Sequence, residues 1–410
     1  MSASHPCRSC GQPDLQLVLS LGSLPLANAL VTAEQLDQTE STYPLDLAFC
    51  SNCSLVQITE TVPPEELFRD YLYFSSFSDT MLHHAQAIVE RMLESQPLDA
   101  NSLAVEIASN DGYLLQYYQR AGIPVLGIEP AINIARVAQD ERGIRTLTDF
   151  FGARTASHLV AQGERADVIH ANNVLAHVPD LNGFVRGLRL LLKPDGVAII
   201  EVPYVKDLID RCEFDTIYHE HLCYFSLTAL NQLFERHGLV IENVERLTIH
   251  GGSLRIFVRL ESGATRSAAV TGLLEEEMRW GVNRLDFYQG FARRVEELKT
   301  SLRNFVFDLK GQKRRLAAYG AAAKGSTLLN YFGIGRSALD FVVDRSTHKQ
   351  GRYMPGVRLP ICAPAKLLEE MPSHVLLLTW NFADEILLQQ AEYRRRGGRF
   401  IIPIPELRVV

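Results

Sequence analysis

Two closely spaced pairs of cysteines near the N-terminus constrain the fold of this chain more than any other feature of its sequence. Cys7 and Cys10 form one pair, and Cys50 and Cys53 form the other. Two residues between cysteines place both thiolates on one tight turn, and two such turns complete a tetrahedral sulfur site for zinc. Because thiolates fill all four positions, we expect a structural zinc. Two redox-active pairs or four unrelated thiols are the alternatives.

The segment around these cysteines is expected to depend on the metal for its stability. Residues 45–49 and 55–58 flank the second pair and are predicted to be strands of a hairpin. A segment of about 65 residues has a small core, and a bound zinc substitutes for the missing part of it. We therefore predict a zinc-binding domain over residues 1–70.

Length, composition and charge limit what the rest of the chain can be. The chain has 410 residues, 47% hydrophobic and 22% charged, which is ordinary for a globular protein and suggests two or three domains. Its net charge of −7 predicts no nucleic-acid partner and no anionic membrane surface. The sequence lacks a membrane-spanning apolar run and the apolar core of a signal peptide. We expect a cytoplasmic monomer that acts on a small molecule.

Strand and helix signals alternate between about residues 80 and 260. Repeated βα units of this size are typical of a parallel, doubly wound sheet. Two later strand signals, close together in the sequence, predict an antiparallel hairpin at the edge of that sheet. The predicted strands are residues 101–108, 124–129, 166–171, 196–202, 239–247 and 253–260, and the predicted helices are residues 112–121 and 131–141.

The ends of the first strands form a candidate cofactor site. Glu129 ends the second strand, where a carboxylate accepts the hydroxyls of a ribose. The first loop lacks the G-x-G-x-x-G pattern of an NAD site, and its Asn110 and Asp111 suit the amino-acid part of S-adenosylmethionine better than a pyrophosphate. NAD is the alternative. Asp149 is expected to accept from the adenine amino group while Phe150 stacks on it. The predicted cofactor-binding residues are Glu106, Ala108, Asn110, Asp111, Gly112, Glu129, Pro130, Asp149, Phe150 and Asn172.

Two polar clusters follow later strands of the same region. Asn173 and His177 come directly after one strand, so they are expected over the mouth of the sheet. The second cluster lies in an irregular connection after the next strand and supplies a proton acceptor with a neighbouring carboxylate. A metal bound by its two histidines, or a structural histidine, are the alternatives. The second cluster consists of Tyr218, His219, Glu220 and His221.

A second nucleotide-binding pattern occurs near the C-terminus. Helical sequence over residues 266–313 precedes a strand at 315–319, a small-residue loop at 320–327 and a strand at 339–343. Small residues let backbone amides approach phosphates at a helix N-terminus, and Lys324 adds positive charge. A loop of small residues kept for packing is the alternative. The predicted substrate-binding residues are Gly320, Ala323, Lys324, Ser326, Asp344, Trp380 and Asn381.

In their order along the chain, these motifs resemble those of the bacterial sugar C-methyltransferases. The resemblance rests on the cysteine pairs, residues 106–112, Asn173 with His177, residues 218–221 and residues 319–327, and it covers essentially the whole chain. It implies an α/β protein of three domains that methylates a nucleotide-linked keto-deoxysugar, with dTDP as the expected nucleotide. A zinc-binding domain (1–70), a Rossmann-like methyltransferase domain (71–262) and a Rossmann-like nucleotide-sugar-binding domain (263–410) are expected.

The resemblance also implies catalytic roles. His221 would be the general base that forms an enolate next to the sugar carbonyl, with Glu220 orienting its imidazole. Tyr218, His177 and Asn173 would surround the reacting sugar as hydrogen-bond donors that stabilise the enolate oxygen, and Tyr71 or Tyr73 would close the site. Ala108 departs from the glycine of many class I methyltransferases and narrows the approach of the cofactor. An O- or N-methyltransferase, or a non-catalytic nucleotide-sugar-binding protein, are the alternatives.

Overall fold

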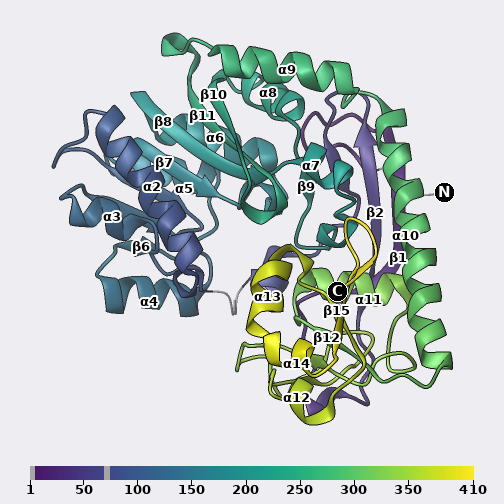
Figure 1. Cartoon of the computed structure of the whole chain (residues 1–410). Coiled ribbons are helices and arrows are strands. Elements are labelled where there is room, and N and C mark those ends of the chain that lie inside the picture. Colours follow the sequence, from purple (N-terminus) through teal and green to yellow (C-terminus); the bar gives the residue numbers. More distant parts are fainter. Residues whose placement is uncertain (1–4, 69–73) are drawn as a thin grey trace.

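The computed structural model describes residues 5–68 and 74–410, which form an α/β protein built around three β-sheets (Figure 1). This is the fold class predicted from the sequence. Among the described residues, no helix is both long enough and apolar enough to span a membrane.

The first sheet is antiparallel and has the strand order β1-β2-β3-β9. The predicted hairpin around the second cysteine pair is confirmed, because β2 pairs with β3 there. The fourth strand comes from far along the chain, so residues near 223 complete the N-terminal sheet. Its strands are β1 (Leu15–Pro25), β2 (Thr42–Cys50), β3 (Val56–Ile58) and β9 (Cys223–Tyr224).

The second sheet has seven strands in the order β10-β11-β8-β7-β4-β5-β6. Its pairs from β8 to β6 are parallel, whereas β11 runs antiparallel to both β8 and β10, which confirms the predicted edge hairpin. The strand order reverses at β4, where ligands of such sheets bind. The strands are β4 (Ala104–Ile107), β5 (Val125–Ile128), β6 (Thr146–Leu147), β7 (Ala166–Asn172), β8 (Leu192–Pro203), β10 (Leu239–Leu247) and β11 (Ser253–Leu260).

Helices connect these parallel strands, as the βα pattern predicts. The helix expected over 112–121 begins three residues late, because residues 108–112 form a loop with left-handed backbone angles. The helices are α2 (Asp79–Ser95), α3 (Leu115–Arg120), α4 (Ile132–Arg142), α5 (Ala153–Ala161), α6 (Leu181–Leu191), α7 (Val205–Asp210) and α8 (Leu227–Glu235), with a short α1 (Pro64–Phe68) before them.

The predicted helical segment before the third sheet forms two helices, α9 (Ala268–Trp280) and α10 (Leu285–Gly311). The buried residues of α10 recur every three or four positions, so one face of this long helix is apolar. That face packs along the first sheet, where the rings of Tyr288 and Phe49 lie 4.9 Å apart (Figure 1). Glu277 of α9 is fully buried and accepts a hydrogen bond from Tyr204, which ties α9 to the second sheet.

The third sheet has the order β14-β13-β12-β15-β16-β17, and only β17 is antiparallel to its neighbour among the described strands. Its order also reverses at the first strand, β12. The strands are β12 (Leu316–Tyr319), β13 (Val342–Val343), β14 (Ile361–Cys362), β15 (His374–Leu377), β16 (Arg399–Ile402) and β17 (Arg408–Val409), and the helices are α11 (Ala323–Phe332), α12 (Lys366–Glu370), α13 (Ala383–Gln389) and α14 (Ala391–Arg395).

Candidate functional site

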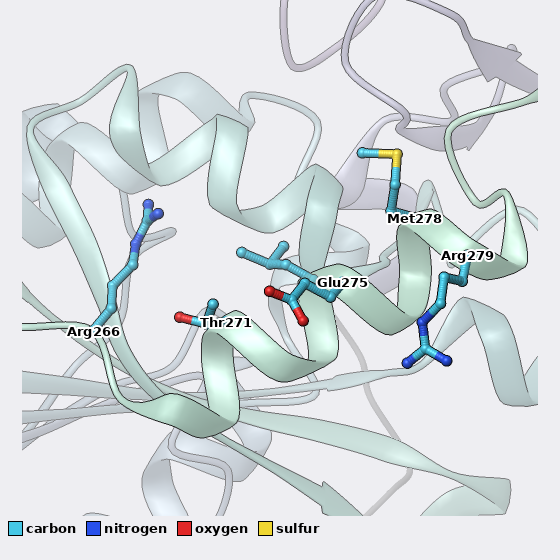
Figure 2. Close-up of a pocket in the computed structure, with 6 residues that line it drawn as sticks. Arg266, Thr271, Glu275, Met278 and Arg279 are labelled. Carbon is cyan, nitrogen blue, oxygen red and sulfur yellow. The ribbon is translucent and has the colours of Figure 1, made fainter.

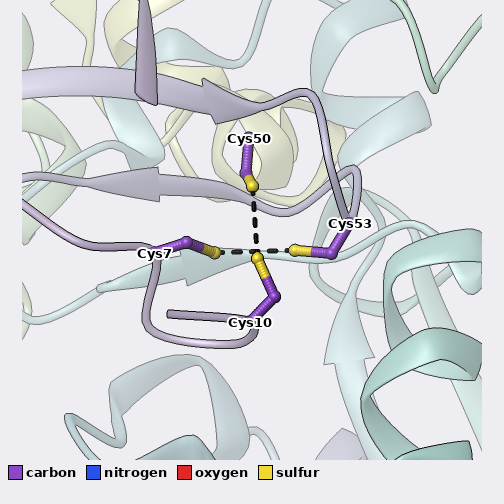
Figure 3. A group of neighbouring side chains, drawn as sticks. All are labelled: Cys7, Cys10, Cys50 and Cys53. Carbon is purple, nitrogen blue, oxygen red and sulfur yellow. Dashed lines mark hydrogen bonds between the residues drawn. The ribbon is translucent and has the colours of Figure 1, made fainter. Parts of the chain in front are cut away.

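The four cysteines of the two pairs converge on one point (Figure 3). The sulfur atoms of Cys7 and Cys53 are 3.5 Å apart, as are those of Cys10 and Cys50, and all four lie within 4.8 Å of one another. A tetrahedral zinc with bonds of about 2.3 Å holds sulfurs about 3.8 Å apart, so the cluster fits this metal. Within residues 5–68 and 74–410, no other group of His, Cys, Asp or Glu side chains converges in this way.

Both cysteine turns close with the same backbone hydrogen bond. The N–H of Gly11 donates to the carbonyl of Cys7, and the N–H of Ser54 donates to the carbonyl of Cys50, each at 2.8 Å. The fifth residue of each turn has a left-handed φ, which is 73° at Gly11 and 60° at Ser54. The repeated C-x-x-C spacing therefore produces two equivalent turns, as the sequence predicts.

The surroundings of the sulfurs favour a bound cation. Gln57 is fully buried, and its side-chain amide donates to the sulfur of Cys7 at 3.2 Å. The hydrogen bond to Cys7, together with burial, raises the pKa of the Cys53 thiol. Four thiolates this close repel one another unless a cation lies between them, and zinc supplies that charge.

The first cysteine turn also docks on the second sheet's helices. Asn182 of α6 donates to the carbonyls of Arg8 and Ser9 at 3.0 and 3.1 Å, and the Arg236 guanidinium donates to the Ser9 carbonyl at 3.1 Å. The metal therefore fixes both the local turn and the place where the N-terminal sheet meets the rest of the protein.

The predicted cofactor loop follows β4 and is held in an unusual backbone conformation. Ala108, Asn110 and Gly112 have φ values of 54°, 49° and 78°, in the left-handed region. A Cβ atom on Gly112 would lie 2.3 Å from the end of the buried Ile144 side chain, which, together with the positive φ, favours glycine there. Ala108 occupies a conformation that favours glycine, at a cost of about 1–3 kcal/mol, and such strain is common where a loop approaches a ligand.

Glu129 links the loops after β4 and β5. Its two carboxylate oxygens accept hydrogen bonds from the backbone N–H groups of Asn110 at 2.9 Å and Ala131 at 2.8 Å. The side chain is buried, which raises the pKa of its carboxyl group. Glu129 therefore sits rigidly at the end of the second strand, as predicted, and its remaining lone pairs can accept ribose hydroxyls.

Two further acids of the predicted site lie beside it. Glu106 is fully buried on β4, and burial, with the nearby Asp111 and Glu129 carboxylates, raises its pKa well above the usual value. Asp111 is paired with Arg142 of α4 at 3.2 Å. This acidic end of the sheet suits the positively charged amino group of S-adenosylmethionine.

The segment that precedes α2 covers this loop. The N–H of Ser75 donates to the Asn110 side chain at 2.8 Å, and the Ser76 hydroxyl contacts the Asp111 carboxylate. These serines lie on the short turn η2 (Ser75–Phe77). Tyr71 and Tyr73, predicted to close the site, lie outside the described residues.

The other predicted cofactor residues lie at the same edge of the sheet. Asp149 follows β6, and its carboxylate accepts hydrogen bonds from Arg154 and Thr155. Phe150 beside it is 36% exposed, so its ring is available for stacking. Pro130 lies two residues beyond the end of β5, next to Glu129. Asn172 ends β7, and its side-chain oxygen is buried with no hydrogen-bond partner among the described residues.

Replacing Glu129 with alanine is expected to weaken S-adenosylmethionine binding roughly tenfold to a hundredfold. The change removes acceptors for the ribose hydroxyls, and hydrogen bonds to charged groups contribute about 1.5–3 kcal/mol. Calorimetry measures the effect. Asp344→Ala is the matched control, because Asp344 directly follows β13 of the third sheet, as Glu129 follows β5, and accepts from the N–H groups of Ala321 and Ser346 in the same way. A loss equal to that control would contradict this assignment.

The hydrogen bonds of His221 define which of its nitrogens can accept a proton. Nδ1 lies 2.8 Å from the Thr216 carbonyl oxygen, which can only accept, so Nδ1 carries the ring's proton. Nε2 of the neutral ring then holds a lone pair, which the Tyr218 hydroxyl faces at 3.1 Å. This arrangement suits a general base that acts through Nε2.

The expected orienting role of Glu220 is corrected by this geometry. A backbone carbonyl, that of Thr216, orients the imidazole, whereas the Glu220 carboxylate accepts from the Asn28 side chain at 2.7 Å. Burial raises the pKa of Glu220 to about 7. Asn28 comes from the N-terminal part of the chain, and sequence reasoning missed it because no motif marks it.

His177 lies against His221, with ring centroids 4.8 Å apart. It belongs to the turn η3 (Leu175–His177), just beyond β7, so the residues predicted to be catalytic lie near the predicted cofactor residue Asn172, which ends this strand. Its Nδ1 donates to the Glu220 carbonyl at 2.6 Å, and burial lowers its pKa to about 4. The neutral ring therefore presents an acceptor at Nε2, which corrects the expected role of His177 as a donor to an enolate oxygen.

His219 and Asn173, two further residues of the predicted clusters, form hydrogen bonds with backbone carbonyls. His219 is buried and bonds through Nε2 to the carbonyls of Tyr43 and Pro44 at 3.2 and 3.1 Å, so it is a structural histidine. Asn173 has a left-handed φ of 55°, and its N–H donates to the Glu201 carbonyl at 2.8 Å. The Asn173 side-chain oxygen is buried, with no hydrogen-bond partner in the described part of the chain.

The small-residue loop after β12 leads into α11, as predicted. Gly320 has a φ of 98°, and a Cβ atom there would lie 2.6 Å from Thr379. A Cβ atom on Gly325 would lie 2.8 Å from Leu378. Tight packing against the residues after β15 therefore accounts for part of the small-residue pattern. Ala323, at the start of α11, is itself buried.

The predicted substrate-binding roles of Ser326 and Trp380 are corrected by the structure. Ser326 is 1% exposed and its hydroxyl lies beside the Asn330 side chain, inside α11. Trp380 is buried on the turn η7 (Trp380–Phe382), and its indole N–H donates to Asp215 at 2.7 Å. The Ser326 side chain is therefore buried within α11, and the Trp380 side chain is engaged by Asp215. Asn381, beside Trp380, is half-buried.

A pocket elsewhere on the molecule contains none of the predicted residues. It lies along the outward side of α9 (Figure 2) and is lined by Arg266, Thr271, Leu274, Glu275, Met278 and Arg279. Because none of the residues predicted to bind the cofactor or the substrate lines it, this pocket is distinct from the candidate site.

Three protein-family models together match nearly all of this chain. Residues 7–68 match a model described as "Putative zinc binding domain", residues 79–244 match a methyltransferase domain, and residues 248–405 match a C-methyltransferase C-terminal domain. The first match begins at Cys7 and contains all four cysteines of the cluster.

The chain is also similar to several proteins of known name. The chain is 37% identical over 405 residues to the C-methyltransferase NovU of Streptomyces niveus, covering 98% of this chain and 96% of that protein. A ubiquinone biosynthesis O-methyltransferase of Methylobacterium nodulans is 34% identical over 29% of this chain and 46% of its own length. The solved structure of magnesium protoporphyrin IX methyltransferase from Synechocystis, with bound SAM, covers 43% of this chain and 79% of that one at 14% identity and a TM-score of 0.34.

Proposed function

Since this chain belongs to the C-methyltransferase family, as an S-adenosylmethionine-dependent methyltransferase with a structural zinc, we propose that it methylates a carbon of a nucleotide-linked keto-deoxysugar. The observation that carries the proposal is the pair of hydrogen bonds that leave Nε2 of His221 as a proton acceptor beside the cofactor edge of the second sheet. dTDP is the nucleotide that we propose.

A ketone next to the reacting carbon makes the chemistry feasible. A carbon atom is a poor nucleophile until it loses a proton, and an adjacent carbonyl stabilises the resulting charge as an enolate. Nε2 of His221 takes that proton, and the electron pair of the broken C–H bond moves onto the carbonyl oxygen. When bound, S-adenosylmethionine supplies an electrophilic methyl group for the enolate carbon.

Two side chains next to His221 can donate to the enolate oxygen. The Tyr218 hydroxyl already contacts Nε2 of His221. The buried Glu220 carboxyl has a pKa of about 7, so a large fraction is protonated near neutral pH and can act as a donor. Donors aimed at developing charge in a site shielded from water typically contribute several kcal/mol to such a step.

We propose that the sugar's nucleotide binds at the start of α11. There the backbone N–H groups near Ala323 and the Lys324 ammonium face a diphosphate, and Asp344 lies where a ribose is recognised. We also propose a cytoplasmic location, because none of the seven cysteines, all of which lie in the described residues, forms a disulfide, and thiolate sites persist in reducing compartments.

The proposal is tested by incubating the protein with a panel of nucleotide-linked keto sugars and methyl-labelled S-adenosylmethionine. Mass spectrometry detects transfer, and NMR locates the new methyl group. A methyl group on carbon next to the carbonyl supports the proposal. A methyl group on oxygen or nitrogen would instead make this protein an O- or N-methyltransferase.

Lys324→Ala is expected to raise the KM for the sugar nucleotide roughly tenfold to a hundredfold and to leave the KM for S-adenosylmethionine nearly unchanged. The reason is the loss of a charged contact to the diphosphate, worth about 1.5–3 kcal/mol. Steady-state kinetics with each substrate varied in turn measures the split. Lys310→Ala is the control, since Lys310 belongs to the same unit but pairs with Asp340. Equal changes in both KM values would argue against this placement.

A further inference from the structure

A short turn of the methyltransferase part is held by the C-terminal part of the chain. This turn, η4 (Phe214–Thr216), precedes the catalytic residues directly. The ring of Phe214 stacks on Phe332 of α11, with centroids 4.8 Å apart and planes 16° apart. The next residue, Asp215, accepts the Trp380 indole N–H at 2.7 Å. Both Phe214 and Asp215 are fully buried, so the C-terminal part fixes two successive residues of the turn.

The third residue of the turn contacts the proposed base. The Thr216 carbonyl accepts the proton on Nδ1 of His221 at 2.8 Å. The turn itself closes through the Thr216 N–H and hydroxyl, which both donate to the Glu213 carbonyl, so Thr216 has little freedom once its neighbours are fixed. A continuous path of contacts therefore runs from Trp380 through Asp215 and Thr216 to His221.

The same path begins at the proposed nucleotide site. The Lys324 ammonium lies 4.7 Å from the centroid of the Trp380 ring, and Lys324 stands in the first turn of α11. The helix that presents its N-terminus to the diphosphate is also the helix whose Phe332 clamps the turn. Nucleotide binding and the position of the Thr216 carbonyl thus depend on one rigid element.

We propose that Trp380 is a positioning residue for His221: its N–H holds Asp215, and through it the Thr216 carbonyl, so that the base keeps its lone pair on Nε2. A neutral imidazole carries a single proton, and the hydrogen bond at one nitrogen decides which nitrogen is left as the acceptor. This inference rests on the proposed role of His221 as the base that deprotonates a keto sugar.

Trp380→Phe tests the inference, because phenylalanine keeps a ring beneath Lys324 but removes the N–H donor. We expect kcat to fall about tenfold to a hundredfold, the loss that a small misplacement of a catalytic group produces, while KM for both substrates changes little. Exchange of the sugar's α-hydrogen with deuterated solvent should slow by the same factor. A residue that contacts the substrate directly would raise KM instead.

Variants of Asp215 separate positioning from general damage to the fold. Asp215→Ala removes the acceptor and should reproduce the kcat loss, and the double variant with Trp380→Phe should be no slower than either single one. Asp215→Asn keeps an acceptor oxygen and should restore most of the rate. Arg294→Ala is the matched control, because Arg294 donates to the Asp210 carbonyl at the same junction without touching η4.

A spectroscopic measurement needs no substrate. In protein labelled with ¹⁵N-histidine, the imidazole shifts of His221, assigned with His221→Ala, should report a proton on Nδ1 in the native chain and a mixture of both tautomers in Trp380→Phe. An unchanged tautomer and unchanged kcat in Trp380→Phe would overturn the inference even if the native enzyme methylates a keto sugar. Absence of α-hydrogen exchange in the native enzyme would refute the proposed function instead.

Discussion

His221→Ala is expected to methylate about a hundredfold to ten-thousandfold more slowly than the native chain while still binding both substrates. A positioned general base typically contributes a factor of this size. The variant removes the only atom of residue 221 that can accept the proton, Nε2, and leaves the cofactor loop after β4 and the start of α11 untouched. The expected signature is a loss in kcat with little change in the dissociation constant of either ligand.

Two measurements make this prediction specific. Single-turnover rates with a saturating keto sugar report the chemical step, and exchange of the sugar's α-hydrogen with deuterated solvent reports proton removal alone. Both should fall together in His221→Ala. His83→Ala is the control, because it also removes an imidazole, but from an exposed position on α2. Full activity of His221→Ala would rule out the enolate mechanism with this base.

Cys50→Ser is expected to release zinc and to unfold the N-terminal part of the chain. Structural zinc sites contribute about 10–16 kcal/mol of binding free energy, which equals or exceeds the whole stability of a typical domain, about 5–15 kcal/mol. Cys50 lies at the end of β2 and is 1% exposed, so the serine would leave both a gap in the metal site and a buried polar group. Metal analysis should find about one zinc per native chain and almost none in the variant.

Loss of the zinc should also destabilise parts of the protein that do not contact the metal. β3 pairs with β9, and Asn28 contacts Glu220, so unfolding of the N-terminal sheet removes support from the segment that carries the proposed base, His221. Thermal unfolding followed by circular dichroism should show a lower first transition in Cys50→Ser and in native protein treated with a strong chelator. Cys362→Ser, a half-buried cysteine of β14, is the control. A metal-free native protein of unchanged stability would contradict the structural role of zinc.

Local patterns predicted the parts of this protein that lie within one segment. The C-x-x-C spacing predicts each cysteine turn because the turn closes within five residues. The alternation of apolar strands and helices predicts both parallel sheets, since each βα unit follows from nearby residues. The positions of Glu129 and Asp344 follow for the same reason, because each directly follows a parallel strand and so lies at the edge of the sheet where ligands bind, and their ligand-binding roles stay predictions.

Only the tertiary structure decided which groups meet. The sequence suggested Glu220 as the partner of His221, because neighbours in a motif look like partners, yet the Thr216 carbonyl takes that place and Asn28 takes the carboxylate. It suggested that Trp380 faces a ligand, whereas the packing of α11 and η7 against η4 directs the indole N–H to Asp215. Spacing along the chain determines backbone turns and strand ends, but hydrogen bonds between distant segments depend on how the three sheets dock, and that docking follows from the packing of the whole chain.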